Sequence, residues 1–249
     1  MATIVSLHAH PDDEALLTGG WLAQRAAAGD RVVLVFATDG GAGLAAPRPG
    51  SASLAQVRRV EAAASAAAIG AARLVWLGHA DSGMAGRPTH DARRFADVPV
   101  DDAARAVAAV LDDEAADVLT GYDANGGYGH PDHVQVHRVA RRAQDLAATR
   151  PLLLEATVDR TWLVRLLRLV RPFASLLRGI TLPGDEIFSE RSAVGLAVDV
   201  RPDLAAKRAS LAAHASQRTG GLRTVTLLLA LPRPLSGRVL GTEWFVEVA

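Results

Sequence analysis

The amino-acid sequence predicts an α/β fold built on a mostly parallel sheet. Short apolar runs alternate along the 249-residue chain with longer Ala-rich stretches of helical composition. Each apolar run is bounded by Gly, Asp or His, as buried parallel strands tend to be. Strands and helices in alternation are typical of a parallel sheet that is covered by helices.

The individual elements follow from this pattern. Four apolar runs in the first half predict strands at residues 2–8, 31–37, 73–77 and 117–121. The stretches between and after them predict helices at residues 14–28, 53–69, 101–115 and 132–148. The second half is less regular, and it predicts a small C-terminal α+β portion with strands at 192–200 and 243–248 and a helix at 202–217.

The composition excludes several classes of function. Lys plus Arg equals 27 and Asp plus Glu equals 27, so net charge offers no basis for binding nucleic acid or an anionic membrane. The chain has no cysteine, which excludes disulfides and thiolate metal sites. The N-terminus lacks the pattern of a signal peptide, and arginines interrupt the longest apolar stretches. We therefore expect a cytoplasmic enzyme without a membrane span.

Polar clusters follow each of the first four predicted strands. They read HPDDE, TDGG, GHADSGM and YDANGGYGHPDH in chain order. Sites in open α/β sheets gather at the carboxyl ends of the strands, so these clusters are the candidate site. The Gly- and Pro-containing stretch 40–50 is a candidate lid, because long loops near sites often move.

The first motif, HPDDE, predicts metal ligands at a strand-to-helix turn. His10 and Asp13 are three residues apart, and imidazole and carboxylate are standard ligands for zinc and related divalent metals. Asp12 then stays beside the metal as a free carboxylate, which suits a general base. The alternative is that these acids only cap a helix. Glu14 is interpreted as a structural residue of the first turn, and His8 as a supporting or packing residue.

The second motif, at residues 122–133, predicts a glycine-rich approach to a helix that carries two histidines. His130 and His133 are three residues apart, so one can bind metal while the other faces a substrate carbonyl. Asp132 lies between them and could orient an imidazole through its ring N–H. The alternative is a glycine-rich loop whose histidines are satisfied structurally, and the presence of the first motif argues against it.

A rival ligand pair is formed by His133 and His137, whose four-residue spacing suits two ligands on one helix face. With His10 and Asp13, these two histidines would fill all four tetrahedral positions. A catalytic metal must keep a position for water. We therefore interpret His137 as a packed helix residue.

Taken together, the two motifs resemble the PIG-L/LmbE-like N-acetylglucosaminyl deacetylase family. The resemblance rests on AHPDDE at 9–14 and GHPDH at 129–133, and it is closest to the mycothiol-pathway deacetylases and amidases. It extends to Arg58, Glu61, Ile69-Gly70, Asp81-Ser82-Gly83-Met84, Lys207, His214 and Gln217. It implies a Rossmann-like sheet with helices on both faces, in one domain over 1–249 whose part 151–200 is a variable region on the substrate side.

The resemblance also implies a role for each matching residue. The implied metal ligands are His10, Asp13 and His133, holding Zn²⁺ or another first-row divalent metal such as Fe²⁺. Asp12 is the implied general base, and His130 the implied oxyanion stabiliser or acid. The remaining implied residues are Arg58 and Asp81, which bind substrate, and Tyr128, a mobile tyrosine of the active site.

The expected function is metal-dependent removal of an N-acyl group, chiefly N-acetyl, from an amino sugar or related small molecule. Alternatives are an amidase of mycothiol-type conjugates and a deacylase of long-chain acyl glycosides. The apolar, basic segment 160–180 is expected to be a helix packed on the sheet, or else an acyl-binding wall or a lipid contact. A non-catalytic metal-binding protein is a further alternative; a nucleotide-binding module lacks the GxGxxG motif. The partner is a small N-acylated substrate, and homo-oligomerisation is left open.

Overall fold

A seven-stranded sheet forms the centre of the computed structural model, which describes residues 1–42, 52–84, 93–159, 161, 188–218 and 224–248. The strand order is β3-β2-β1-β4-β5-β7-β6. The strands are β1 (Thr3–His8), β2 (Arg31–Thr38), β3 (Arg73–His79), β4 (Val118–Tyr122), β5 (Leu152–Thr157), β6 (Leu196–Asp199) and β7 (Thr242–Val248). The first five strands pair in parallel, whereas β7 runs antiparallel to both β5 and β6. The C-terminal portion therefore extends the same sheet.

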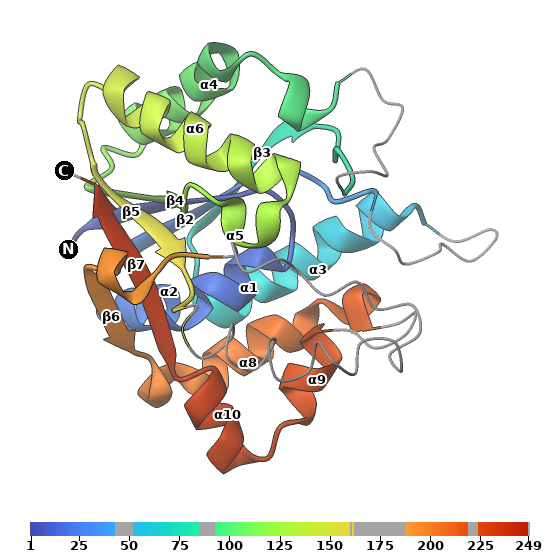
Figure 1. Cartoon of the computed structure of the whole chain (residues 1–249). Coiled ribbons are helices and arrows are strands. Elements are labelled where there is room, and N and C mark those ends of the chain that lie inside the picture. Colours follow the sequence, from blue (N-terminus) through green and yellow to red (C-terminus); the bar gives the residue numbers. More distant parts are fainter. Residues whose placement is uncertain (43–51, 85–92, 160, 162–187, 219–223, 249) are drawn as a thin grey trace.

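Helices cover both faces of the sheet. The longer ones are α1 (Asp13–Leu17), α2 (Gly19–Ala27), α3 (Leu54–Ile69), α4 (Val100–Asp113), α6 (Pro131–Leu146), α8 (Leu204–Ala213), α9 (Thr224–Ala230) and α10 (Arg233–Val239), and α5 (Gly126–Gly129) is a single turn. Figure 1 shows α4 and α6 on one face and α1, α2, α3 and α8 on the other. This arrangement confirms the predicted α/β fold with a mostly parallel sheet.

Most predicted elements are present, with several differences. Helices α9 and α10 are absent from the prediction, and the strand expected at 192–200 is confined to β6, after a short 3-10 helix at Arg191–Ala193. The helix expected at 14–28 is divided into α1 and α2 by Thr18, whose ψ of −3° departs from strand geometry and whose φ of −134° departs from helical geometry. The break lets α2 pack tightly: a Cβ atom at Gly20 would lie 2.7 Å from the side chain of Val200. Strand β5 is also absent from the prediction, and it joins the C-terminal strands to the parallel sheet.

The centre of the sheet is apolar but contains a small buried polar network. Ser6 Oγ lies 2.6 Å from Thr120 Oγ1 on the neighbouring strand and 2.8 Å from His8 Nε2. His8 Nδ1 lies 3.1 Å from the hydroxyl of Tyr122. These contacts satisfy groups that are costly to bury alone. His8 is thus held inside the sheet, and burial, as the largest cause, lowers its pKa to about 4.

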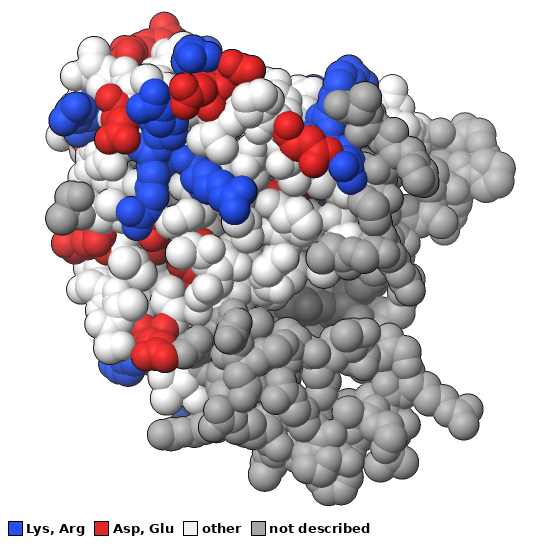
Figure 2. Space-filling view, turned by 45° about the horizontal axis from the view of Figure 1, so that its top comes forward, with Lys and Arg blue, Asp and Glu red and all other residues white. Residues whose placement is uncertain are grey.

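The surface formed by α4 and α6 carries mixed charges. Figure 2 shows acidic and basic side chains side by side on this face. Ion pairs account for part of the pattern: Arg142 Nε lies 2.8 Å from Asp101 Oδ1, and Arg105 Nη1 lies 2.8 Å from Asp102 Oδ1. Within the described part of the chain, no helix is both long and apolar enough to cross a membrane.

Two segments singled out in the sequence lie largely outside the described residues. Of the candidate lid at 40–50, the structure describes only residues 40–42. Of the apolar, basic segment at 160–180, it describes only Thr161. Their predicted roles therefore stay predictions.

Candidate metal centre

The two polar motifs meet where the strand order reverses. Strand β1 pairs with β2 on one side and with β4 on the other, so the chain connections leave the sheet in opposite directions at this point. The HPDDE motif follows β1 directly, and the GHPDH motif follows β4 and the turn α5. Because parallel strands end at the same edge, motifs that are about 120 residues apart in sequence come together here.

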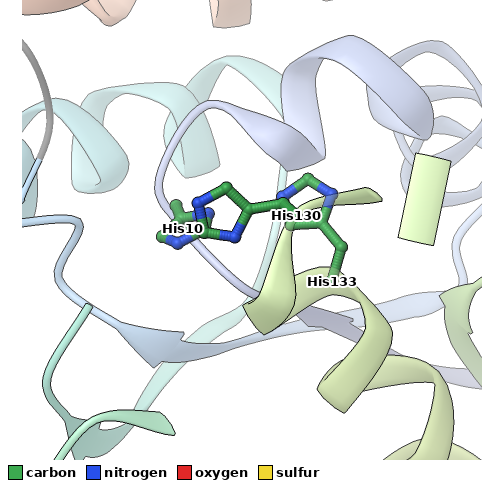
Figure 3. Close-up of side chains that lie close together, drawn as sticks. All are labelled: His10, His130 and His133. Atoms are coloured by element: carbon green, nitrogen blue, oxygen red, sulfur yellow. The ribbon is translucent and has the colours of Figure 1, made fainter. Parts of the chain in front are cut away.

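His10, Asp13 and His133 converge at this edge. Asp13 Oδ2 lies 3.4 Å from His10 Nδ1 and 3.3 Å from His133 Nε2. The backbone N–H of His10 also donates to Asp13 Oδ2 over 2.9 Å, which closes the turn. All three side chains are buried. Figure 3 shows the imidazoles of His10, His130 and His133 close together, with both later histidines at the start of α6.

This donor set fits a divalent metal. Within the described residues, the buried Nε2 of His133 makes no hydrogen bond, although it lies 3.3 Å from Asp13 Oδ2. Tetrahedral zinc with bonds of about 2.0–2.1 Å would separate neighbouring ligand atoms by about 3.3 Å. The separations of 3.4 and 3.3 Å around Asp13 match that spacing. Two imidazoles and a carboxylate also suit zinc chemically.

His10 contacts a second set of acids through its other ring nitrogen. Its Nε2 lies 3.1 Å from Asp132 Oδ2 and 3.5 Å from Asp81 Oδ1. Burial opposes a charge on this imidazole, but its hydrogen bonds to the carboxylates of Asp13, Asp132 and Asp81 prevail and raise its pKa well above the usual value. Asp132 is itself held by the backbone N–H of Ser82, over 3.0 Å. Asp132 therefore lies where it can orient His10.

Among the described residues, two groups of possible ligand atoms lie close enough together to hold a metal ion, and Asp13 belongs to neither group. In both, the possible ligand atoms lie within 4.8 Å of one another. One comprises His10, His130 and His133, and the other comprises His10, Asp81, His130 and Asp132. His137 belongs to neither grouping; its Nδ1 lies 3.0 Å from Glu155 Oε1 and 3.1 Å from the carbonyl oxygen of Tyr122.

Asp12 lies at the edge of the cluster in an unusual backbone conformation. Its φ of 111° is in a region that side-chain-bearing residues rarely adopt. Its carboxylate Oδ1 accepts a hydrogen bond of 3.1 Å from Arg58 Nη2. Burial raises the pKa of Asp12 to about 6, although the positive charge of Arg58 opposes this shift and Asp13 adds to it.

His130 has a defined ring orientation because it caps helix α6. Its Nδ1 accepts the backbone N–H of Asp132 over 3.2 Å. In the neutral ring the proton must then be on Nε2, which makes that nitrogen a donor. Burial, together with the nearby His10 and His133, lowers the pKa of His130 to about 4.

Tyr128 lies over the histidines on a turn built from glycines. Its ring centroid is 5.1 Å from that of His133 and 6.1 Å from that of His130, and the residue is 47% exposed. Gly126, with a φ of 57°, packs so closely that a Cβ atom would lie 2.6 Å from the backbone nitrogen of Val134. The turn is thus fixed against α6, with Tyr128 at its outer end.

Arg58 and Asp81, which the resemblance associates with substrate, have different surroundings. Arg58 is buried; it donates to the carbonyl oxygen of Gly40 over 2.8 Å, and also to the carbonyl oxygen of Pro11 and to Asp12. Asp81 borders a cavity of about 510 Å³ at the carboxyl ends of β2 and β3. The cavity is lined by Asp39, Gly41, Ala42, Arg59, Gly78, His79, Ala80, Asp81 and Arg93.

One buried contact at the site was not expected from the sequence. Glu14 Oε1 lies 2.6 Å from Nε2 of His214, and both side chains are fully buried. Ser65 on α3 donates to the same Glu14 oxygen over 2.5 Å. Glu14 had been interpreted as a residue of the helix turn, and no local spacing connects it with His214. The family resemblance is the one signal in the sequence that singles out His214.

Comparisons with known proteins show which family the chain resembles over most of its length. A family model described as PIG-L, GlcNAc-PI de-N-acetylase, matches residues 5–144. A 1D-myo-inositol 2-acetamido-2-deoxy-alpha-D-glucopyranoside deacetylase of Rhodococcus erythropolis is 35% identical over 241 residues, covering 87% of this chain and 81% of that protein.

Two solved structures show how widely this fold is used. The N,N'-diacetylchitobiose deacetylase from Pyrococcus horikoshii superposes with a TM-score of 0.62 at 17% identity, over 99% of this chain and 83% of that one. GalB, the 4-carboxy-2-hydroxymuconate hydratase of Pseudomonas putida KT2440, superposes with a TM-score of 0.65 at 16% identity, over 100% and 97%. A deacetylase and a hydratase therefore share the fold, and the reaction must be argued from the side chains.

Proposed function

The chain belongs to the PIG-L family of de-N-acetylases, and from that premise we propose that it hydrolyses the acetamide of an N-acetylglucosaminyl glycoside, with an inositol glycoside as the first candidate. The products are acetate and a free amino sugar glycoside. The observation that carries the proposal is the meeting of His10, Asp13 and His133 with a carboxylate, Asp12, that is held beside them by Arg58.

We propose that His10, Asp13 and His133 hold a divalent metal ion, with zinc as the first candidate. The buried Nε2 of His133, which makes no hydrogen bond within the described residues, and the ligand-atom spacing around Asp13 support this assignment. Such an ion supplies Lewis acidity, which polarises an amide carbonyl and makes water more acidic. Asp132 would keep the His10 ring in place through Nε2, as carboxylates commonly do behind metal-binding histidines.

Asp12 is proposed to act as the general base. It accepts a proton from the attacking water as the new C–O bond forms at the acetamide carbon. When the C–N bond breaks, the same carboxyl group returns the proton to the departing amine nitrogen. The hydrogen bond from Arg58 holds the carboxylate in one place, so that a single group can serve both proton transfers.

His130 is proposed to stabilise the negative charge that develops on the carbonyl oxygen. Its Nδ1 is occupied by the backbone N–H of Asp132, so Nε2–H is the group left to donate. A fixed donor aimed at a developing oxyanion lowers the barrier without reorganisation. Tyr128, whose ring lies close to those of His130 and His133, is proposed as a second donor to the same oxygen.

The glycoside part of the substrate is proposed to bind beside Asp81. The cavity of about 510 Å³ that Asp81 borders is large enough for a sugar-sized group, and its rim carries both acidic and basic side chains that can bond hydroxyls. Arg58 is less available for this purpose, because its guanidinium already donates to Gly40, Pro11 and Asp12.

The test is a substrate panel with the zinc-loaded chain and free-amine detection. It comprises an N-acetylglucosaminyl inositol, free N-acetylglucosamine, a thiol conjugate of the mycothiol type, and a glucosamine glycoside with a long N-acyl chain. Selective turnover of the first compound supports the proposal. If only the conjugate or only the long-chain amide is hydrolysed, that compound class, and not the acetamide, is the substrate. Metal binding without any amine release would favour a non-catalytic protein.

A further inference from the structure

Asp12 is held in its strained conformation by contacts on both sides. Its φ of 111° is one of four positive values at non-glycine residues in the described part of the chain. On one side, Arg58 donates to the Asp12 carboxylate and to the carbonyl oxygen of Pro11. On the other side, the backbone N–H of Asp12 donates to Glu14 Oε2 over 2.9 Å. A strained residue persists only where its surroundings over-determine it, and strain of this kind concentrates at active sites.

Both carboxylate oxygens of Glu14 take part in holding the backbone of Asp12 in place. While Oε2 accepts the N–H of Asp12, Oε1 accepts His214 Nε2 over 2.6 Å and Ser65 Oγ over 2.5 Å. Glu14 and His214 are 0% exposed. A buried carboxylate with three donors has one defined position, and removal of a donor frees it to rotate or draw in water. The position of the Asp12 backbone therefore depends on groups at the end of α8 and on α3.

His214 has no other polar contact that would explain its burial. Among the described residues its Nδ1 has no hydrogen-bond partner, so the ring makes its one side-chain hydrogen bond to Glu14. His214 is the residue that ends α8, and it is 200 residues away from Glu14 in the sequence. An apolar side chain would fill this place at lower cost if packing were its whole purpose.

We propose that Glu14 and His214 are positioning residues for Asp12. His214, with Ser65, fixes the carboxylate of Glu14, and Glu14 fixes the backbone of Asp12, so that the carboxylate of Asp12 is presented at the metal cluster. This role rests on the proposed function of Asp12 as general base. Neither Glu14 nor His214 touches the substrate in this scheme, and neither binds the metal.

The experiment compares His214→Phe, which keeps an aromatic ring but removes the donor, with His214→Gln, whose amide N–H can still reach Glu14. Arg208→Leu is the matched control, because Arg208 lies on the same helix and donates to Ser236 and to the carbonyl oxygen of Leu229, away from the site. Each variant is measured for kcat and KM on the acetamide substrate, for bound zinc and for Tm. His214→Phe is also combined with Asp12→Asn.

The expected result for His214→Phe is a fall in kcat of about 10–100-fold, as for other groups that orient a catalytic residue, with unchanged KM and zinc content. His214→Gln should recover most of the loss, and Arg208→Leu should keep wild-type kcat. In the Asp12→Asn background, His214→Phe should change the residual rate by no more than about two-fold, because the group it positions is already inactive. Ser65→Ala removes the other side-chain donor to Glu14 Oε1 and should show the same pattern more weakly. It is the test variant if His214→Phe does not fold.

Other outcomes overturn the positioning role. Equal losses from His214→Phe with and without Asp12 would show a general structural effect, and so would failure of His214→Gln to recover activity. Different results would contradict the proposed base role of Asp12 itself. If Asp12→Asn alone keeps full turnover, or the wild-type chain releases no amine, the base role is wrong, and the positioning role falls with it.

Discussion

Asp132 Oδ2 lies 3.1 Å from Nε2 of His10, while Nδ1 of the same ring lies 3.4 Å from Asp13. The two nitrogens of one imidazole thus face two carboxylates, one of them a proposed co-ligand and the other a support. A ring held in this way has a fixed orientation, so that Nδ1 is directed to one point while Nε2–H faces Asp132. This relationship leads to the first prediction.

Asp132→Ala should lower zinc affinity by about 10–100-fold, because His10 loses the carboxylate that orients it. Competition with a chromogenic chelator measures the change. Asp102→Ala is the control, since Asp102 lies on the exposed surface of α4 and pairs with Arg105. Equal zinc affinity in Asp132→Ala and the control would contradict the orienting role.

Asp12→Ala should bind zinc as the wild type does and lose about 10²–10⁴-fold in kcat, the usual contribution of a general base. Amine release gives the rate, and elemental analysis gives the metal content. Full activity in this variant would end the assignment of Asp12 as the base, and loss of zinc would make Asp12 a ligand.

Zinc should stabilise the folded chain, because it binds the folded cluster and not the dispersed ligands of the unfolded chain. At a free concentration about 100 times Kd, it should add about 2.7 kcal/mol and raise Tm by about 5–10 °C. His133→Ala should abolish this shift, whereas His137→Ala should keep it. Calorimetry of chelator-treated protein with and without zinc makes the comparison, and an equal shift in both variants would exclude His133 as a ligand.

Gly126→Ala should destabilise the protein by about 2–4 kcal/mol, because a Cβ atom would meet Val134 at 2.6 Å and the φ of 57° disfavours alanine. Gly129→Ala should cost only about 1–2 kcal/mol, since its φ is 83° but, among the described residues beyond its chain neighbours, no atom lies within 4 Å of the added carbon. Urea unfolding measures both. Equal costs would mean that the turn is not packed against α6 as described.

Glu155 should make the stability of the protein depend on pH. Burial raises the pKa of this carboxyl, but hydrogen bonds from His137 and Arg141 outweigh it, and the net shift is downward from 4.5. A depressed pKa in the folded state stabilises above the unfolded value, and this contribution is lost as the pH falls through the folded value. Glu155→Gln should therefore cost about 1.5–3 kcal/mol at pH 7 and progressively less below about pH 4.5. A pH-independent difference between the two unfolding curves would contradict this coupling.

The parts of the fold that could be predicted from the sequence are those marked by a local pattern of apolar and polar residues. Strands β1 to β4 are short, apolar and sharply bounded, and both motifs follow directly from such strands. Strand β5 escaped prediction because Glu155 interrupts its apolar run, and this acid is tolerated inside only through Arg141 and His137 on α6. A pattern of single residues does not reveal a charge that is neutralised by another element.

The same limit applies to the candidate site. His10, Asp13, His130 and His133 lie in compact motifs, so their types and spacing predicted their cluster. The link between Glu14 and His214 spans 200 residues and leaves no periodic signal. In the sequence pattern Arg58 looks like an ordinary helix residue, and only the structure shows that α3 places it against Asp12.

The hydrogen bond between Glu14 and His214 also bears on how the site is assembled during synthesis. The family match ends at residue 144, and every proposed metal ligand has been made by then. The support of Asp12 is completed only when residue 214 has left the ribosome and α8 has docked on α1 and α3. A nascent chain could thus bind zinc early and yet reach its full rate of hydrolysis only once the last third of the polypeptide has been made.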